Sequence, residues 1–235
     1  MARVAVLHNT LDGRGGADAV CLHVCEALQD DHDVTLFTLS RAGLPALNDL
    51  FDTAADVPVR VPAATGALNA ALDLVASRTG PLLPLRSVLL DRYFRRSADG
   101  FDLAVSTANE FALPVPSVQY VHYPQFNLAR VGDGGRLDPL WSRLAGVDSL
   151  AADASMLANS AWTADVVERV YGRQPDVLHP PVAPIDDPLP WEQRERAFVV
   201  LGRIAPDKRV LDAVRIVEGV RERGHDVGLR VVGSA

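Results

Sequence analysis

The 235-residue chain lacks a surplus of basic residues. It has 30 acidic and 23 basic residues, and its formal net charge at pH 7 is −7. Proteins that bind nucleic acids usually present a basic face, so this composition argues against that class. Lysine is almost absent as well, since Lys208 is the only one and every other base is arginine. At Lys208 the chain therefore departs from its own preference for arginine.

Cysteine and long apolar runs are also scarce. Cys21 and Cys25 lie four residues apart in a segment expected to be helical, with no further Cys/His cluster, so we interpret them as buried free thiols rather than a zinc site. No apolar run reaches the roughly 20 residues that cross a bilayer. The first residues lead directly into a strand-like run and not into a signal peptide. We expect a cytoplasmic protein, at most peripheral on the inner face of a membrane.

Short apolar runs alternate along the chain with segments of helical periodicity. The expected strands are 4–8, 34–39, 103–106, 118–122, 156–159 and 177–179, and the expected helices are 16–29, 68–77, 85–96, 139–152 and 163–171. Buried strands separated by helices are typical of a parallel sheet with helices on both faces. The sequence therefore predicts an α/β fold with a Rossmann-like doubly wound parallel sheet.

A proline-rich segment interrupts this alternation. Its five prolines are Pro180, Pro181, Pro184, Pro188 and Pro190. Proline fixes φ and removes a hydrogen-bond donor, so we interpret residues 181–196 as a linker after a first domain of residues 1–180.

After the linker the pattern restarts. Residues 197–235 have one strand-helix-strand pattern, at 198–201, 209–223 and 229–232. We interpret this unit as the start of a second Rossmann-like domain, incomplete because one such unit cannot bury both faces of its sheet. The alternative is that the unit packs on the first sheet.

Two glycines, Gly15 and Gly16, end a long loop between the first strand and the first helix. Glycine lets backbone N–H groups face a ligand, and a helix N-terminus favours anions. The loop is too long for the dinucleotide-binding fingerprint and lacks its Gly-x-Gly-x-x-Gly pattern. The alternative interpretation is an ordinary glycine-rich turn.

His122 stands in the sequence Tyr-Val-His-Tyr-Pro at the carboxyl end of an expected central strand. Open α/β sheets place ligands at this edge. An imidazole there can donate to a sugar hydroxyl or to a leaving phosphate. The alternative is a packed histidine with no ligand.

Gly202, Arg203 and Lys208 follow the expected strand at 198–201. An arginine fork and a lysine point charge at a strand end can clamp a diphosphate. The alternative is a surface loop with ordinary charges.

These motifs resemble the family-4 glycosyltransferases of the retaining GT-B class, over residues 3–235. The matching pieces are Arg14-Gly15-Gly16-Ala17, His122, the sequence Leu-Ala-Asn-Ser-Ala-Trp-Thr at 157–163, the proline-rich crossing, and Gly202-Arg203 with Lys208. The Tyr-Val-His-Tyr-Pro sequence is most similar to mannosyltransferases that extend lipid-linked oligosaccharides on the cytosolic face of membranes.

The resemblance implies transfer of a hexosyl group, with retention and without a metal, from a GDP- or UDP-linked sugar to a lipid-linked or polysaccharide acceptor. It implies that Gly15 and Gly16 lie near the donor phosphates and the acceptor, and that His122 contacts the transferred sugar. It implies that Gly202, Arg203 and Lys208 hold the diphosphate, with the two cations stabilising it as it leaves.

Two rival functions remain. The family's Glu-x7-Glu motif, which holds the nucleotide ribose, would lie beyond residue 235, so one rival is a non-catalytic binding module or partner subunit. The other is a nucleotide-binding oxidoreductase, which the loop of residues 13–16 fits poorly.

The segment 84–96 is a candidate membrane surface. It contains four arginines against one aspartate, and its apolar residues Leu85, Val88, Leu89, Tyr93 and Phe94 fall at helical spacing. This pattern is typical of a helix lying on an anionic bilayer. The alternative is an amphipathic helix packed on its own sheet.

The sequence Asp31-His32-Asp33 has the spacing of a metal-binding Asp-x-Asp motif. It precedes its strand instead of following it, so we interpret it as a polar turn and expect no metal.

Overall fold

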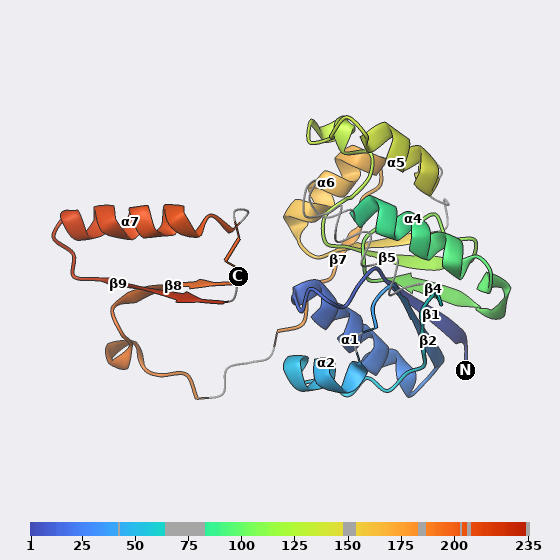
Figure 1. The fold of residues 1–235 in the computed structure, drawn as a ribbon, viewed down its shortest axis with the longest axis horizontal. Coiled ribbons are helices and arrows are strands. Elements are labelled where there is room, and N and C mark those ends of the chain that lie inside the picture. Colours follow the sequence, from blue (N-terminus) through green and yellow to red (C-terminus); the bar gives the residue numbers. More distant parts are fainter. Residues whose placement is uncertain are drawn as a thin grey trace. The chain divides into compact units, whose positions relative to one another are not determined.

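The computed structural model (Figure 1) divides into two compact units, Met1–Val182 and Ala183–Ala235. It describes residues 1–41, 43–63, 83–147, 154–182, 187–202, 204–205 and 208–233. The division falls at the start of the proline-rich segment.

The first unit is built on a seven-stranded sheet with the order β3-β2-β1-β4-β5-β6-β7, and all neighbouring strands are parallel. The strands are β1 (Arg3–His8), β2 (Asp33–Thr38), β3 (Val59–Arg60), β4 (Leu103–Ser106), β5 (Ser117–Val121), β6 (Ser155–Ala158) and β7 (Asp176–Val177). The predicted Rossmann-like doubly wound fold is thereby confirmed. The strand order reverses between β1 and β4, and open α/β sheets bind ligands at such a switch point.

Helices cover both faces of this sheet (Figure 1). One face carries α1 (Gly16–Gln29) and α2 (Leu44–Phe51), and the other carries α4 (Leu83–Phe94), α5 (Asp138–Ala145) and α6 (Ala161–Tyr171). Short 3-10 turns lie at Ala98–Gly100 and Leu128–Val131.

The two layers of core follow from the alternation of side chains along β1. Val4 and Val6 pack in one cluster with Cys21 of α1, whereas Ala5 and Leu7 pack in a second cluster with α4 on the opposite face. Successive residues of a strand point to opposite faces, so a strand covered on both sides is apolar throughout. Cys21 and Cys25 are buried free cysteines, as predicted.

Helix α2 and strand β3 were not predicted, and the helix expected at 139–152 is shorter than predicted. Strand β3 has two residues and thus no pattern to detect. The helix expected at 139–152 ends at Ala145, because Gly146 adopts a left-handed φ of 68° that caps it. The helix expected at 68–77 lies outside the described residues.

The apolar side chains of α4 pack into the core of the first unit. Val88, Leu90 and Phe94 are buried, and Leu89 and Tyr93 pack partly buried against the same core. Arg92 is exposed, as is Arg96 two residues after the helix ends. The apolar side chains of this segment therefore match the alternative interpretation, a helix packed on its own sheet. Among the helices described, none has the length and apolar character required to cross a bilayer.

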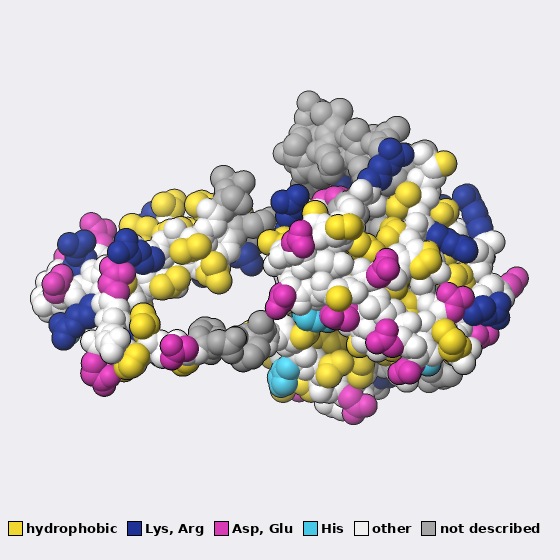
Figure 2. Space-filling view, turned by 90° about the horizontal axis from the view of Figure 1, so that it is seen from below, with side chains coloured by type: hydrophobic (Ala, Val, Ile, Leu, Met, Phe, Trp, Pro, Cys, Tyr) yellow, Lys and Arg dark blue, Asp and Glu magenta, His cyan; other side chains and the backbone are white. Residues whose placement is uncertain are grey.

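The second unit is one strand-helix-strand motif: β8 (Ala197–Leu201), α7 (Val210–Glu222) and β9 (Gly228–Val232), with parallel strands and a 3-10 turn at Trp191–Gln193 before them. Among its described residues, Val217 is the one buried hydrophobic side chain. Apolar side chains such as Val199, Leu201 and Leu211 are exposed, and Figure 2 shows hydrophobic side chains gathered on the surface of this unit.

Candidate functional site

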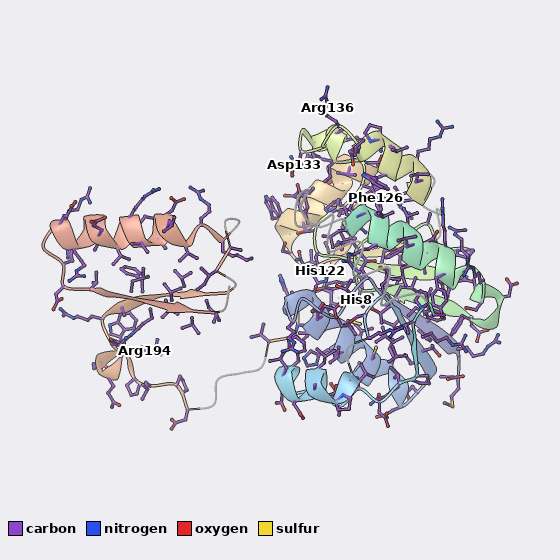
Figure 3. The ribbon with its side chains drawn as sticks, in the orientation of Figure 1. His8, His122, Phe126, Asp133, Arg136 and Arg194 are labelled. Atoms are coloured by element: carbon purple, nitrogen blue, oxygen red, sulfur yellow. The ribbon has the colours of Figure 1, made fainter. Side chains whose placement is uncertain are left out.

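The candidate site of the first unit lies at the carboxyl edge of the sheet, where β1, β4 and β5 end. His8 ends β1, Thr107 follows β4, and His122 follows β5. Both histidines bond to Thr107, and Figure 3 shows them at the middle of this unit. Because β1 and β4 flank the reversal of strand order, these residues stand at the switch point of the fold.

The glycine loop delivers the N-terminus of α1 to the same edge. Gly15 caps the helix with an extended backbone, and its N–H donates to a carboxylate oxygen of Asp18 at 3.2 Å. A Cβ added at Gly15 or Gly16 would meet no atom of the described residues within 4 Å, and neither glycine has a positive φ. The chain's own packing therefore does not require glycine at these two positions.

His8 is held from both sides in a buried ion pair. Its side chain is only 3% exposed, its Nε2 lies 2.9 Å from Oδ1 of Asp18, and its Nδ1 lies 3.0 Å from the hydroxyl oxygen of Thr107. Burial alone would lower the pKa of His8, but the interactions with Cys21 and Asp18 outweigh burial and raise the pKa to about 10. Burial also raises the pKa of the Cys21 thiol.

His122 is oriented by main-chain and side-chain contacts. Its Nε2 lies 3.2 Å from the carbonyl oxygen of Thr107, and its backbone N–H donates to Oδ1 of Asn109 at 2.8 Å. Burial lowers the pKa of His122, and the neighbouring His8 lowers it further. The imidazole is therefore neutral at neutral pH and donates from Nε2.

The Asn-Ser-x-Trp-Thr sequence begins α6 beside His122. Ser160 caps the helix by accepting from the Thr163 N–H at 3.2 Å, and the Thr163 hydroxyl donates to the carbonyl oxygen of His122 at 3.3 Å. Trp162 is 63% exposed and stacks on Tyr123, with ring centroids 5.7 Å apart. The motif thus caps a helix and anchors the backbone of the candidate site.

Sequence reasoning identified Gly15, Gly16 and His122 but assigned no role to His8, Asp18 or Thr107. His8 could have been identified from its place at a strand end, because it is the last residue of β1, much as His122 directly follows β5. Its partners were not detectable in this way, because Thr107 is 99 residues away and is brought near only by the pairing of β1 with β4.

The second unit carries the remaining predicted residues. Gly202 follows β8 with a φ of 142°, and its N–H donates to the carbonyl oxygen of Val232 at 3.0 Å. Lys208 is exposed, and its backbone N–H donates to Ala205. Arg203 lies outside the described residues. The fold therefore places a turn and then the exposed Lys208 after β8.

A hollow of about 560 Å³ adjoins this turn, lined among others by Arg209 and Arg215. Both guanidinium groups bond to Asp212, at 2.7 and 3.2 Å. The two arginine side chains are 79% and 74% exposed, as Lys208 is exposed, but both are paired with Asp212 within the unit.

Metal ligands do not cluster in the described part of the chain, where no group of three or more His, Cys, Asp or Glu side chains is placed to hold an ion. Asp31 and His32 lie in the turn between α1 and β2, at the amino end of the strand. They are thus at the opposite edge from the candidate site, consistent with their interpretation as a polar turn.

No protein-family model matches this chain, and none of the curated proteins matches it. Functional assignment therefore depends on the residues and on the geometry described above.

Proposed function

We propose that this chain is part of a retaining glycosyltransferase, which transfers a hexosyl group from a nucleoside diphosphate sugar to a hydroxyl group of a lipid-linked or polysaccharide acceptor. The observation that carries the proposal is the carboxyl edge at the switch point. There the helix N-terminus at Gly15 and Gly16 and the neutral imidazole of His122 are joined by one set of hydrogen bonds, which is buried around His8.

Each part of this edge suits a piece of the donor. Backbone N–H groups at a helix N-terminus favour phosphate oxygens, and the missing side chains at Gly15 and Gly16 leave room for close approach. A neutral histidine suits a sugar hydroxyl, with which it exchanges a hydrogen bond without a charge. A dinucleotide enzyme would instead use the short glycine fingerprint, which this loop lacks.

The second unit would supply the cations of the reaction. In the proposed step the bond between the anomeric carbon and the diphosphate oxygen breaks and negative charge grows on the diphosphate. The anomeric carbon bonds to the acceptor's hydroxyl oxygen, and the hydroxyl proton passes to the leaving diphosphate. Lys208, with Arg203 and the turn at Gly202, would stabilise this charge. The exposed side chain of Lys208 supports this role, because it has the freedom to reach an anion.

We propose that any binding to a membrane is electrostatic and does not involve insertion of apolar side chains. Arg92 and Arg96 are exposed at the end of α4, whereas the apolar residues of the segment Leu85 to Arg96 largely pack into the core. If an anionic membrane presents the acceptor, vesicle binding should fall with added salt. Co-sedimentation with anionic vesicles at two salt concentrations measures this, and salt-independent binding would contradict the proposed mode.

Ligand panels test the function directly. GDP or UDP should raise the melting temperature of the chain, because a ligand that binds the folded state stabilises it. NAD should not, because its diphosphate joins two nucleosides and has no terminal phosphate group. Absence of a response to both diphosphates counts against a glycosyltransferase, and a response to NAD alone favours the oxidoreductase. Binding of a diphosphate without sugar transfer to any acceptor would support a non-catalytic binding module instead.

A further inference from the structure

A buried histidine beside the site, His8, has hydrogen-bond partners that fix its charge. Both carboxyl oxygens of Asp18 have a partner: Oδ1 lies 2.9 Å from His8 Nε2, and Oδ2 accepts from the Gly15 N–H at 3.2 Å. The carboxylate form of aspartate can only accept hydrogen bonds. Opposite this carboxylate, Nε2 of His8 carries the hydrogen of the 2.9 Å contact.

The second ring nitrogen faces the hydroxyl of Thr107. That hydroxyl also lies 3.4 Å from the carbonyl oxygen of Leu7, which can only accept. If the hydroxyl hydrogen points to Leu7, Nδ1 of His8 must supply the hydrogen of the 3.0 Å contact, and this length is typical of N–H···O bonds. Both ring nitrogens then donate, which only an imidazolium can do.

We infer that His8 is a permanently charged positioning residue, which with Asp18 and Thr107 fixes the Gly15 amide on one side and the neutral Nε2–H form of His122 on the other. The links are direct. Asp18 binds His8 and Gly15, and Thr107 binds His8 through its hydroxyl and His122 through its carbonyl oxygen.

The surroundings of His8 agree with a fixed charge. The titratable groups that face it are Asp18 and Cys21 from α1 and His122 after β5. Cys21 and Asp18 both raise the pKa of His8, and burial raises the pKa of the Cys21 thiol well above its ordinary value. Asp18 is the carboxylate that pairs with His8, and the positive charge of His8 disfavours a second proton on His122.

This arrangement determines what His122 can offer a ligand. Its Nε2–H is already donated to Thr107, so the neutral ring has only the lone pair of Nδ1 left. A lone pair accepts a hydrogen bond from a hydroxyl group and repels a phosphate oxygen. Of the two roles open to a histidine at this strand end, contact with a sugar hydroxyl is therefore favoured over donation to a leaving phosphate, a consequence that rests on the proposed function.

The charge assignment is tested on the free protein, without any nucleotide. Histidine labelled with 15N reports the protonation of each ring nitrogen by NMR, and the signals of the six histidines are assigned from single His→Gln variants. Between pH 6 and pH 8, His8 should show both nitrogens protonated and His122 only Nε2. A neutral His8, or His122 protonated on Nδ1, would overturn the inference.

A variant pair tests the coupling. His8→Gln removes the positive charge and leaves Asp18, so the proton affinity of His122 should rise by about tenfold or more. His23→Gln is the control, since His23 is a half-buried residue of α1 that faces Glu26 instead of the site. An unchanged titration of His122 in folded His8→Gln would refute the coupling.

If His8→Gln does not fold, the spectrum of the unsubstituted protein still decides the charge of His8. The result is also independent of the ligand panel. A chain that binds no diphosphate can retain the charged His8, and a chain with neutral His8 can still bind GDP or UDP.

Discussion

The two units carry their candidate residues in opposite environments. In the first unit His8 and Asp18 are 3% and 5% exposed and bond to each other, whereas in the second unit Lys208 is exposed to solvent. A buried ion pair is destabilising once one partner is removed, but an exposed cation can be lost at little cost. Substitutions in the buried ion pair of the first unit should therefore alter stability, whereas substitution of Lys208 in the second unit should alter binding alone.

Removal of Asp18 should have the largest effect. Asp18→Ala leaves the buried imidazolium of His8 without its counter-ion, so we expect the free energy of unfolding to fall by about 3–5 kcal/mol. Urea unfolding measures this. A Trp191→Phe background restricts the tryptophan fluorescence to the first unit, because the other two tryptophans lie there.

The matched control is the exposed pair between Arg3 and Asp102, whose side chains are 51% and 48% exposed and 2.8 Å apart. Asp102→Ala should reduce the stability far less than Asp18→Ala does, because solvent screens the pair. Equal losses in the two variants would show that burial does not distinguish the two pairs, and the comparison would fail.

The pH dependence of stability tests the same pair without removing Asp18. The pKa of His8 is raised from 6.5 to about 10, so the folded state binds a proton that the unfolded state releases in this window. The resulting stabilisation is complete below pH 6.5 and is lost as the pH rises through about 10. Unfolding measured from pH 6 to pH 10 should show a decline that His8→Gln flattens; parallel curves for the two proteins would contradict it.

The sequence was sufficient for six of the seven strands of the sheet and insufficient for the network beneath the site. Apolar runs such as 4–8 and 103–106 are a local signal, and they became β1 and β4. The contact of His8 with Thr107 is not local, because it depends on β4 lying beside β1 in the sheet. The position of His122 was predictable from a rule about strand ends, but its hydrogen-bond donor state depends on that same long-range pairing.

Gly16→Ala should separate binding from stability within the first unit. An added Cβ meets no described atom within 4 Å and alanine favours a helix over glycine, so the stability should stay equal or rise by less than about 1 kcal/mol. If phosphates approach this helix N-terminus, the affinity for GDP or UDP should fall by about tenfold or more, as calorimetry would measure.

Gly172→Ala is the control for the glycine substitution. Gly172 caps α6 with a φ of 67°, a left-handed conformation that costs an alanine roughly 1–2 kcal/mol. It should lower stability and leave affinity unchanged. If Gly16→Ala loses stability, or if its affinity for GDP and UDP is unchanged, the glycine loop has a structural role and does not bind a ligand.

The smallest effect on stability is expected in the second unit. Lys208→Ala removes an exposed side chain, so the free energy of unfolding should change by less than about 0.5 kcal/mol. The affinity for GDP or UDP should nevertheless fall roughly 10- to 100-fold, because a hydrogen bond to a charged group contributes about 1.5–3 kcal/mol.

Arg221→Ala is the control. It removes the same charge from an exposed position of α7 and should leave the affinity unchanged. Both variants could instead weaken binding equally, and added salt could abolish the loss of affinity relative to the unsubstituted chain. In that case the loss reflects the overall positive potential of the unit, and Lys208 is not a specific ligand of the diphosphate. Lys208→Arg sharpens the test further: full affinity with arginine would show that the position needs only a positive charge, whereas a loss would explain why an arginine-rich chain keeps its one lysine here.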